Sequence, residues 1–190
     1  MKLPVNRQSI FAGLIVLACS ISPNAFAQLN SSSASVALTA TLAESLTISA
    51  TPATVTFTLV SGAAATGSAP VVITTNWLLK PTRATVVLDG YFASATAALT
   101  DASSPANNIP SSEVFGQVTT GTPTTFTAFT QTAALGAAGA GLALLSQSVT
   151  SANRNSTRTD NLNLKIDLTN HPQLPAGSYS GTLTLQAQAL

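Results

Sequence analysis

The chain offers few side chains that could perform acid–base, nucleophilic or metal-dependent chemistry. It has one histidine, His171. Acyl transfer needs a nucleophile, a base and an orienting group, and metal sites usually need several histidine or carboxylate ligands. His171 lies in Thr-Asn-His-Pro, a sequence typical of a turn, where we expect a solvated or backbone-bonded imidazole. The sequence marks no catalytic partner for it.

The carboxylates and arginines are equally poor candidates for a reactive site. Asp160 and Asp167 lie on or beside one strand-like run, and their odd separation places them on opposite faces. Arg154 and Arg158 form a small polar cluster with Asp160 ahead of this run, which we interpret as a solvated loop. No phosphate-binding glycine motif and no paired-cysteine metal motif is present. We therefore expect no catalytic, cofactor-binding or metal-binding residues, and an enzyme is the least favoured class of function.

The first residues have the character of a secretion signal. Lys2 and Arg7 form a basic head before an apolar stretch, Ile10–Ala18, that is too short to span a bilayer. Ala25-Phe26-Ala27 is a small-x-small cleavage site. We predict that residues 1–27 are a signal peptide and that the protein is exported to the periplasm, the cell surface or the extracellular medium.

A lipoprotein signal is the alternative interpretation of this region. Val16-Leu17-Ala18-Cys19 partly resembles a lipoprotein cleavage box in which Cys19 would be acylated, although the large Leu17 fits the middle of that box poorly. Cleavage after Ala27 would leave residues 28–190, the size of one domain, without a cysteine. This domain would enter an oxidising compartment without using disulfides.

The composition limits the partners of this domain. Charged residues make up 7% of the chain, and residues 28–190 hold five basic and six acidic side chains. No basic patch is present that would neutralise nucleic-acid phosphates. Thr, Ser, Asn and Gln must supply the polar surface, and Thr also favours strands. Such a surface suits an exported protein that packs against copies of itself, and it suits a passive secreted domain equally well.

Short strand-like runs separated by turn residues recur through residues 28–190. They predict an all-β fold, an immunoglobulin-like Greek-key sandwich. Asp89-Gly90 predicts a tight hairpin turn. The Ala- and Gly-rich residues 133–145 predict a mobile loop or a short helix, because they are too few to span a membrane. The runs are Val36–Leu42, Leu46–Ala50, Thr54–Val60, Val71–Leu79, Ala84–Phe92, Val114–Val118, Thr124–Phe129, Asn161–Leu168 and Tyr179–Ala189.

Trp77 is the only tryptophan, and two roles are open to it. Immunoglobulin-like sandwiches often bury one Trp against the opposite sheet, and we expect Trp77 to be such a core residue. The alternative is a stacking platform for a sugar. That role would need neighbouring aromatic and polar groups, and the chain is only 5% aromatic.

Both ends of the predicted domain carry alternating apolar residues. At the C-terminal end, Leu-Pro-Ala-Gly-Ser-Tyr forms a turn that suggests a tyrosine corner and leads into a half-buried strand. One face of that strand holds Tyr179, Gly181, Leu183, Leu185 and Ala187. At the N-terminal end, the residues that project to one side are Val36, Leu38, Ala40 and Leu42. Glu44 breaks this register, so the chain either divides there into a detachable segment and a first strand, or forms one long strand that bends between two sheets.

These ends resemble those of pilin subunits assembled by the chaperone–usher route, including alpha-type fimbrial major subunits and spore coat U-like domains. The similar stretches are Ser35–Leu42 with Leu46–Ser49, and Pro175–Leu185. In that family the sandwich lacks its last strand, and a neighbour's N-terminal segment fills the open groove. The resemblance implies a bacterial fimbrium or other homopolymeric surface fibre or coat, with a periplasmic chaperone and an outer-membrane usher as partners.

Two functions from different classes follow. The favoured one is a non-catalytic structural subunit with residues 28–45 as an N-terminal donor region, Val36 to Leu42 as its inserted strand, and the closing strand from Tyr179 to Ala187 as the acceptor. Three large side chains buried at roughly 1.5–3 kcal/mol each would repay much of the ordering cost of such a strand. The alternative is a free-standing extracellular binding module, for example for carbohydrate, that uses Trp77 or loop residues.

Overall fold

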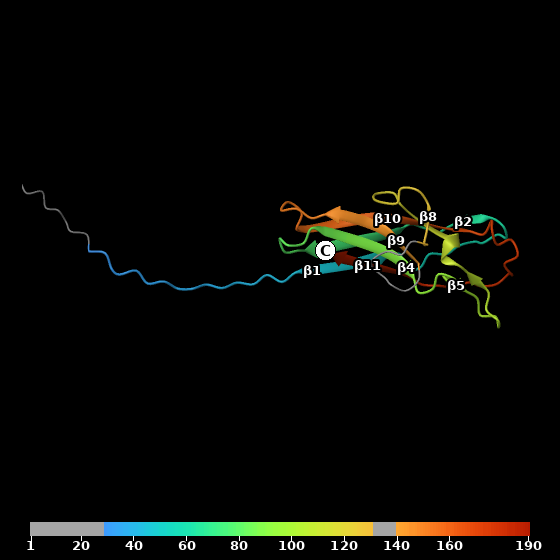
Figure 1. Ribbon diagram of the computed structural model, residues 1–190, viewed down its shortest axis with the longest axis horizontal. Helices are drawn as coiled ribbons and strands as arrows, with labels where there is room; N and C mark the ends of the chain where they lie inside the picture. Colours follow the sequence, from blue (N-terminus) through green and yellow to red (C-terminus); the bar gives the residue numbers. More distant parts are fainter. Residues whose placement is uncertain (1–28, 131–139) are drawn as a thin grey trace, which may run out of the picture. The chain divides into compact units, whose positions relative to one another are not determined.

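The computed structural model describes residues 29–130 and 140–190, and in them the chain is all-β, with antiparallel sheets consistent with a β-sandwich (Figure 1). Residues 41–190 belong to one compact unit, and residues 29–40 lie outside it. The predicted signal peptide, residues 1–27, falls outside the described residues. Within the described ranges, no helix has the length and hydropathy needed to cross a membrane.

The larger sheet is organised around its longest strand, β10. Its strand order is β1-β3-β10-β7-β8, and β2 pairs with the last residues of β10. Alternate residues of β10 are buried from Asp160 onward, as expected for a strand with one face in the core. The strands are β1 (Ser45–Thr51), β2 (Ala64–Thr66), β3 (Val71–Leu78), β7 (Val114–Val118), β8 (Thr127–Ala128) and β10 (Asn155–Asp167).

The smaller sheet has three strands in the order β11-β4-β9. They are β4 (Thr85–Phe92), β9 (Ala140–Ser148) and β11 (Leu183–Ala189). A separate two-stranded pair lies between β4 and β7 in the chain, and a short 3-10 helix precedes β7. These elements are β5 (Leu99–Thr100), β6 (Asn108–Ile109) and η1 (Ser111–Glu113).

The hydrophobic core receives side chains from both sheets. Ile73 and Leu162 come from the larger sheet, and Leu88 and Leu144 come from the smaller one, all fully buried in one cluster. Burial of this apolar area is the main favourable term in folding. The two sheets therefore share a single main core.

A second, smaller cluster lies around Trp77, which is 4% exposed. Its ring packs with Leu79 and Val86, and its indole Nε1 donates a hydrogen bond to the Asn153 carbonyl over 2.7 Å. A buried Trp whose N–H finds an acceptor is an ordinary core residue. The prediction of a core anchor is confirmed. The alternative of a sugar platform is wrong, because the ring face is not accessible.

The predicted hairpin turn at Asp89-Gly90 is wrong. Both residues lie inside β4, which runs without a break from Thr85 to Phe92. The pairing of β4 with β9 shifts between Leu88 and Asp89, which indicates a β-bulge. A Cβ on Gly90 would lie 3.2 Å from atoms of Leu144 and Phe129. Glycine here allows close packing within a strand and does not form a turn.

Further sequence predictions differ from the structure. The closing strand begins only at Leu183, so Tyr179 and Gly181, predicted as part of it, lie ahead of β11. The Ala- and Gly-rich stretch was expected to be a loop or helix, but its described part, from Ala140, begins strand β9, with leucines facing the core. Residues 133–139 lie outside the described residues. Val36–Leu42 and Thr54–Val60 were predicted as strands, yet neither is paired in a ladder. Both have strand-like sequences without a partner strand among the described residues.

Candidate functional site: an open edge of the sandwich

β11 is an edge strand. All seven of its residues pair with β4 on one side, and no strand of the described residues pairs with its other side. The pairing with β4 continues to Leu190, whose N–H donates to the Thr85 carbonyl at 2.8 Å while Thr85 N–H donates back at 3.2 Å. An unpaired strand edge exposes a row of backbone donors and acceptors.

The register shows which β11 residues supply these groups. In an antiparallel ladder, residues alternate between those bonded to the neighbour and those whose N–H and C=O point away. Because Leu190 is bonded to Thr85, the even-numbered residues of β11 face β4. The outward-pointing backbone groups therefore belong to Leu183, Leu185, Ala187 and Ala189. The side chains of the same four residues are half-buried, on the core face.

The segment Thr54–Leu59 supplies a second strand-like wall. Val55, Phe57 and Leu59 are half-buried against the main core, whereas the threonines between them are exposed. Among the described residues of this segment only Thr56 has backbone hydrogen bonds, to the hydroxyl and N–H of Ser68 at 3.2 and 2.9 Å. A sequence with strong β-propensity thus lies in extended alternation without a ladder.

These two walls enclose a groove of about 700 Å³. Its floor is formed by core side chains of both sheets, among them Val71, Phe92 and Ile166. β1 and β11, the edge strands of the two sheets, lie side by side where the groove begins. In the part of the chain that the structure describes, the sandwich is therefore open along one side, with apolar side chains below and unused backbone groups at the rims.

A rigid polar corner bounds one end of the groove. Tyr179 Oη donates to the Pro175 carbonyl at 2.8 Å. Its neighbour Asp101 accepts hydrogen bonds from Ser103 Oγ at 2.6 Å and from the N–H and Nδ2 of Asn107 at 2.7 and 2.9 Å. The Ser103 bond and then the Asn107 bonds lower the pKa of Asp101 to about 2. Desolvation, and then the Asp101 charge, raise the pKa of Tyr179.

We predict that the loop 101–107 loosens in acid with an unusually low midpoint. A carboxylate whose pKa is depressed on folding stabilises the fold above its ordinary value of 3.8, and this stabilisation is lost as the pH falls through about 2. The chemical shift of the Asn107 amide should therefore titrate near pH 2, and Asp101→Asn should abolish that titration. Titration near pH 3.8 instead would show that these hydrogen bonds do not persist in solution.

A charged clasp lies at the opposite end, where β1 begins. Glu44 Oε1 accepts hydrogen bonds from the Lys80 N–H at 2.9 Å and from Arg83 Nε at 3.2 Å, and Lys80 Nζ lies 3.6 Å from Oε2. Arg83 Nη1 in turn donates to the Ala189 carbonyl at 3.3 Å. The Lys80 backbone bond and then the Arg83 bond lower the pKa of Glu44. The sequence break predicted at Glu44 coincides with this clasp, although nothing in the sequence pointed to Arg83.

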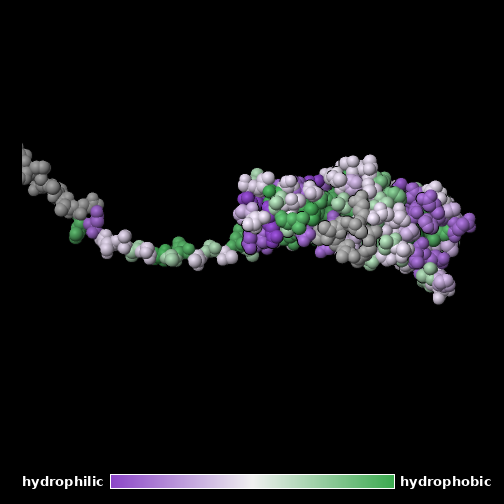
Figure 2. Space-filling view, in the orientation of Figure 1, coloured by the Kyte–Doolittle hydropathy of each residue, from purple (hydrophilic) through white to green (hydrophobic). Residues whose placement is uncertain are grey.

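The predicted donor residues are exposed. Val36 is 82%, Leu38 90% and Leu42 77% exposed, and none of residues 29–44 is in a strand. Figure 2 shows hydrophobic side chains recurring along this stretch between paler residues. The large apolar side chains of this segment are therefore left in contact with water.

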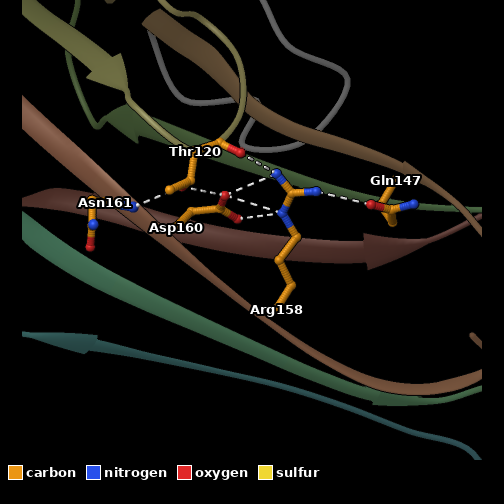
Figure 3. A network of polar contacts seen from close by, with 5 residues as sticks. All are labelled: Thr120, Gln147, Arg158, Asp160 and Asn161. Carbon is orange, nitrogen blue, oxygen red and sulfur yellow. Dashed lines mark hydrogen bonds and ion pairs between the residues drawn. The ribbon is translucent and has the colours of Figure 1, made fainter.

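The prediction that Arg158 and Asp160 belong to a solvated loop is wrong, because they form a polar cluster centred on a buried carboxylate. Both residues lie within β10, and Asp160 is 1% exposed. Arg158 Nε bonds to Asp160 Oδ2 at 2.9 Å, Thr120 Oγ1 donates to Oδ1 at 2.8 Å, and Arg158 Nη1 donates to Gln147 of the other sheet at 2.9 Å (Figure 3). The network satisfies a buried charge and connects the sheets, which is a structural role.

The remaining candidates also occupy structural positions. Lys165 and Asp167 form an ion pair on β10, with Nζ and Oδ2 3.2 Å apart. His171 lies in a turn, as predicted, but its Nδ1 is 3.2 Å from Oε1 of the buried Glu113, a contact that the sequence did not indicate. Among the described residues, no group of three or more His, Cys, Asp or Glu side chains could hold a metal ion.

Comparison of the chain with models of protein families, with curated proteins and with solved structures gave no match.

Proposed function

We propose that this protein is a structural subunit of a surface fibre or coat, in which a segment of a second copy is added as a strand along β11. The observation that carries the proposal is the open groove: an apolar floor with unused backbone hydrogen-bonding groups at both rims. Strand addition satisfies such an edge through main-chain bonds, while alternate side chains fill the pockets below. No catalytic step is part of this function.

The segment Val36–Leu42 has the properties that the groove requires. Its apolar residues alternate with Ala and Thr, so that one face of an added strand would be apolar and the other small and polar. Val36, Leu38 and Leu42 are exposed, and burial would stabilise each by roughly 1.5–3 kcal/mol. Glu44 anchors the chain immediately afterwards, so this segment ends where β1 begins.

The strand order supports an immunoglobulin-like sandwich that is one strand short. In that fold the first, second, fifth and fourth strands form one sheet, and the third, sixth and seventh form the other. The order β1-β3-β10-β7 fits the first sheet, and β4 beside β11 fits the third and sixth strands of the second. A seventh strand would lie on the free side of β11. The bond from Tyr179 to Pro175 is that of a tyrosine corner.

Export and assisted assembly belong to the same proposal. A subunit with an open apolar groove and an unpaired edge is prone to unwanted pairing before it meets its neighbour. A periplasmic chaperone that covers the groove and an outer-membrane usher that exchanges it for the next subunit would meet this need. The predicted signal peptide would bring the chain to them.

The direct test compares two charged variants of the exported chain, residues 28–190. Leu38→Asp should lower self-association at least about a hundredfold, because the inserted strand would bury a carboxylate without a partner. Thr39→Asp is the matched control, since the adjacent side chain would face solvent, and it should assemble normally. Light scattering and electron microscopy of the purified proteins would measure assembly.

Two results would contradict the proposal. One is a wild-type chain that stays monomeric at every concentration and whose stability does not change when residues 28–43 are deleted. The other is equal assembly of the Leu38→Asp and Thr39→Asp proteins, which would mean that the alternating face of the segment is not buried.

A further inference from the structure

Arg83 reaches across the end of the open edge and occupies a backbone acceptor there. Its Nη1 donates to the Ala189 carbonyl at 3.3 Å, and Ala189 is one of the outward-pointing residues of β11. We propose that Arg83 ends the acceptor edge at Ala187 and thereby sets the register of the added strand. This inference rests on the proposed function and specifies how the second copy binds.

The guanidinium is held in place from its other side. Glu44 Oε1 accepts from Arg83 Nε at 3.2 Å, and Glu44 Oε2 lies 3.4 Å from Arg83 Nη2. A guanidinium bound by both carboxylate oxygens loses little freedom when it makes a further hydrogen bond. An incoming strand that used the Ala189 carbonyl would have to displace this bond. Among the described residues, nothing bonds to the outward-pointing backbone groups of Leu183, Leu185 and Ala187, so these remain free to pair.

The direction of the added strand follows from the charges at the two ends of the sandwich. Lys80, Arg83 and Arg154 gather where β1 begins, with Glu44 as the acidic residue among them. At the far end of the groove Asp101 accepts hydrogen bonds only from neutral groups among the described residues. A strand antiparallel to β11 would place the basic end of the donating copy near Asp101. A parallel strand would bring two basic ends together.

Direction and end point, together with Val36 as the first apolar residue of the segment, select a register in which Val36 pairs with the last free acceptor residue, Ala187. With the strand ending at Ala187, the segment pairs in antiparallel order as Val36 with Ala187, Leu38 with Leu185, Ala40 with Leu183 and Leu42 with Gly181. In this register the small Ala40 lies opposite a leucine, and Leu42 lies opposite a glycine. The register shifted by two residues needs the Ala189 carbonyl and places two leucines, Leu42 and Leu183, opposite each other.

Disulfide trapping between two copies distinguishes the registers, because the only cysteine, Cys19, is absent from residues 28–190. In the proposed register Thr39 lies opposite Thr184. These two residues would form a non-hydrogen-bonded pair of the antiparallel ladder. The Cα separation in such a pair, about 4.5 Å, permits a disulfide. In the shifted register Thr39 lies opposite Gln186. A Thr39→Cys chain mixed with Thr184→Cys chains should therefore cross-link about tenfold more than with Gln186→Cys chains, a ratio typical of losing one charge-assisted hydrogen bond.

Removing the guanidinium from the acceptor copy should relax this preference. With Arg83→Ala, cross-linking to Thr184→Cys and to Gln186→Cys should differ by no more than about threefold, since a single neutral ladder bond then separates the registers. Lys80→Ala is the matched control and should keep the wild-type ratio. Lys80 also pairs with Glu44, but among the described residues it makes no hydrogen bond to β11. Glu44→Gln should shift the ratio in the same direction as Arg83→Ala, by less.

The possible results separate this inference from the proposed function. Dominant cross-linking to Gln186→Cys, or a ratio that Arg83→Ala leaves unchanged, would overturn the role of Arg83 while strand addition still stands. Cross-linking at neither position would overturn strand addition and the register with it.

Discussion

Asp160→Ala is expected to lower the free energy of unfolding by about 2–4 kcal/mol. Removing one member of a buried ion pair leaves the other charge without compensation, which typically costs 3–5 kcal/mol. The Arg158 side chain keeps 26% exposure, so water would screen part of that cost. Thr120 would also lose the acceptor of its hydroxyl. Urea unfolding of dilute protein, followed by the fluorescence of the single buried Trp77, would measure the change.

Asp167→Ala is the matched control for this prediction. Asp167 also pairs with a basic residue on β10, but both side chains of that pair are about a quarter exposed. Such a pair contributes at most about 1 kcal/mol. If the two variants lost equal stability, the burial of Asp160 would not be what makes its pair important.

Gly181→Ala is expected to destabilise the domain by about 3 kcal/mol or more. A Cβ at this position would lie 1.9 Å from the carbonyl oxygen of Ala98, and the clash is with backbone, which cannot rotate away. Insertion of atoms into a packed site typically costs 1–3 kcal/mol and occasionally more. The displacement should also break the paired hydrogen bonds of Thr100 and Ser180, both 2.9 Å long. Amide exchange at these two residues would report that loss directly.

Gly177→Ala provides the comparison within the same turn. The nearest atom to its new Cβ is Asp101 Oδ2 at 3.6 Å, an ordinary contact, and its φ is not positive. Alanine there should be neutral or slightly stabilising, because it reduces the freedom of the unfolded chain. If both alanine variants unfolded at the same urea concentration as wild type, the crossing of Ala98 over Gly181 would not be maintained in solution.

The alternation of polar and apolar residues predicted the strands that have one face in the core and the other face in solvent. The run Asn161–Leu168 lies in β10 apart from its last residue, and Leu46–Ala50 lies within β1, since polar and apolar residues alternate in both. β9 was missed because its glycine and alanine residues resemble a connection. Only the neighbouring strand β4 explains why they are compatible with a ladder.

Predictions failed where a residue's role depends on a distant partner. Asp89-Gly90 matches a turn locally, but the packing of Leu144 and Phe129 makes it part of a strand. Thr54–Val60 has the composition of a strand. It is not part of a sheet, because no partner strand reaches it among the described residues. Charge pairs such as Arg158 with Asp160 leave no periodic signal, so their burial could not be read from the sequence.

The long ladder between β11 and β4 has a mechanical consequence. The hydrogen bonds of an antiparallel ladder lie perpendicular to the strands. If a neighbouring subunit is held along β11, tension along the fibre acts parallel to the strands, so it shears these bonds together instead of opening them one at a time. The seven paired residues of β11, extended to Leu190, would share that load with β4 in the interior of its sheet. Residues 28–190 contain no disulfide, so resistance to pulling would come from the orientation of the strands relative to the force.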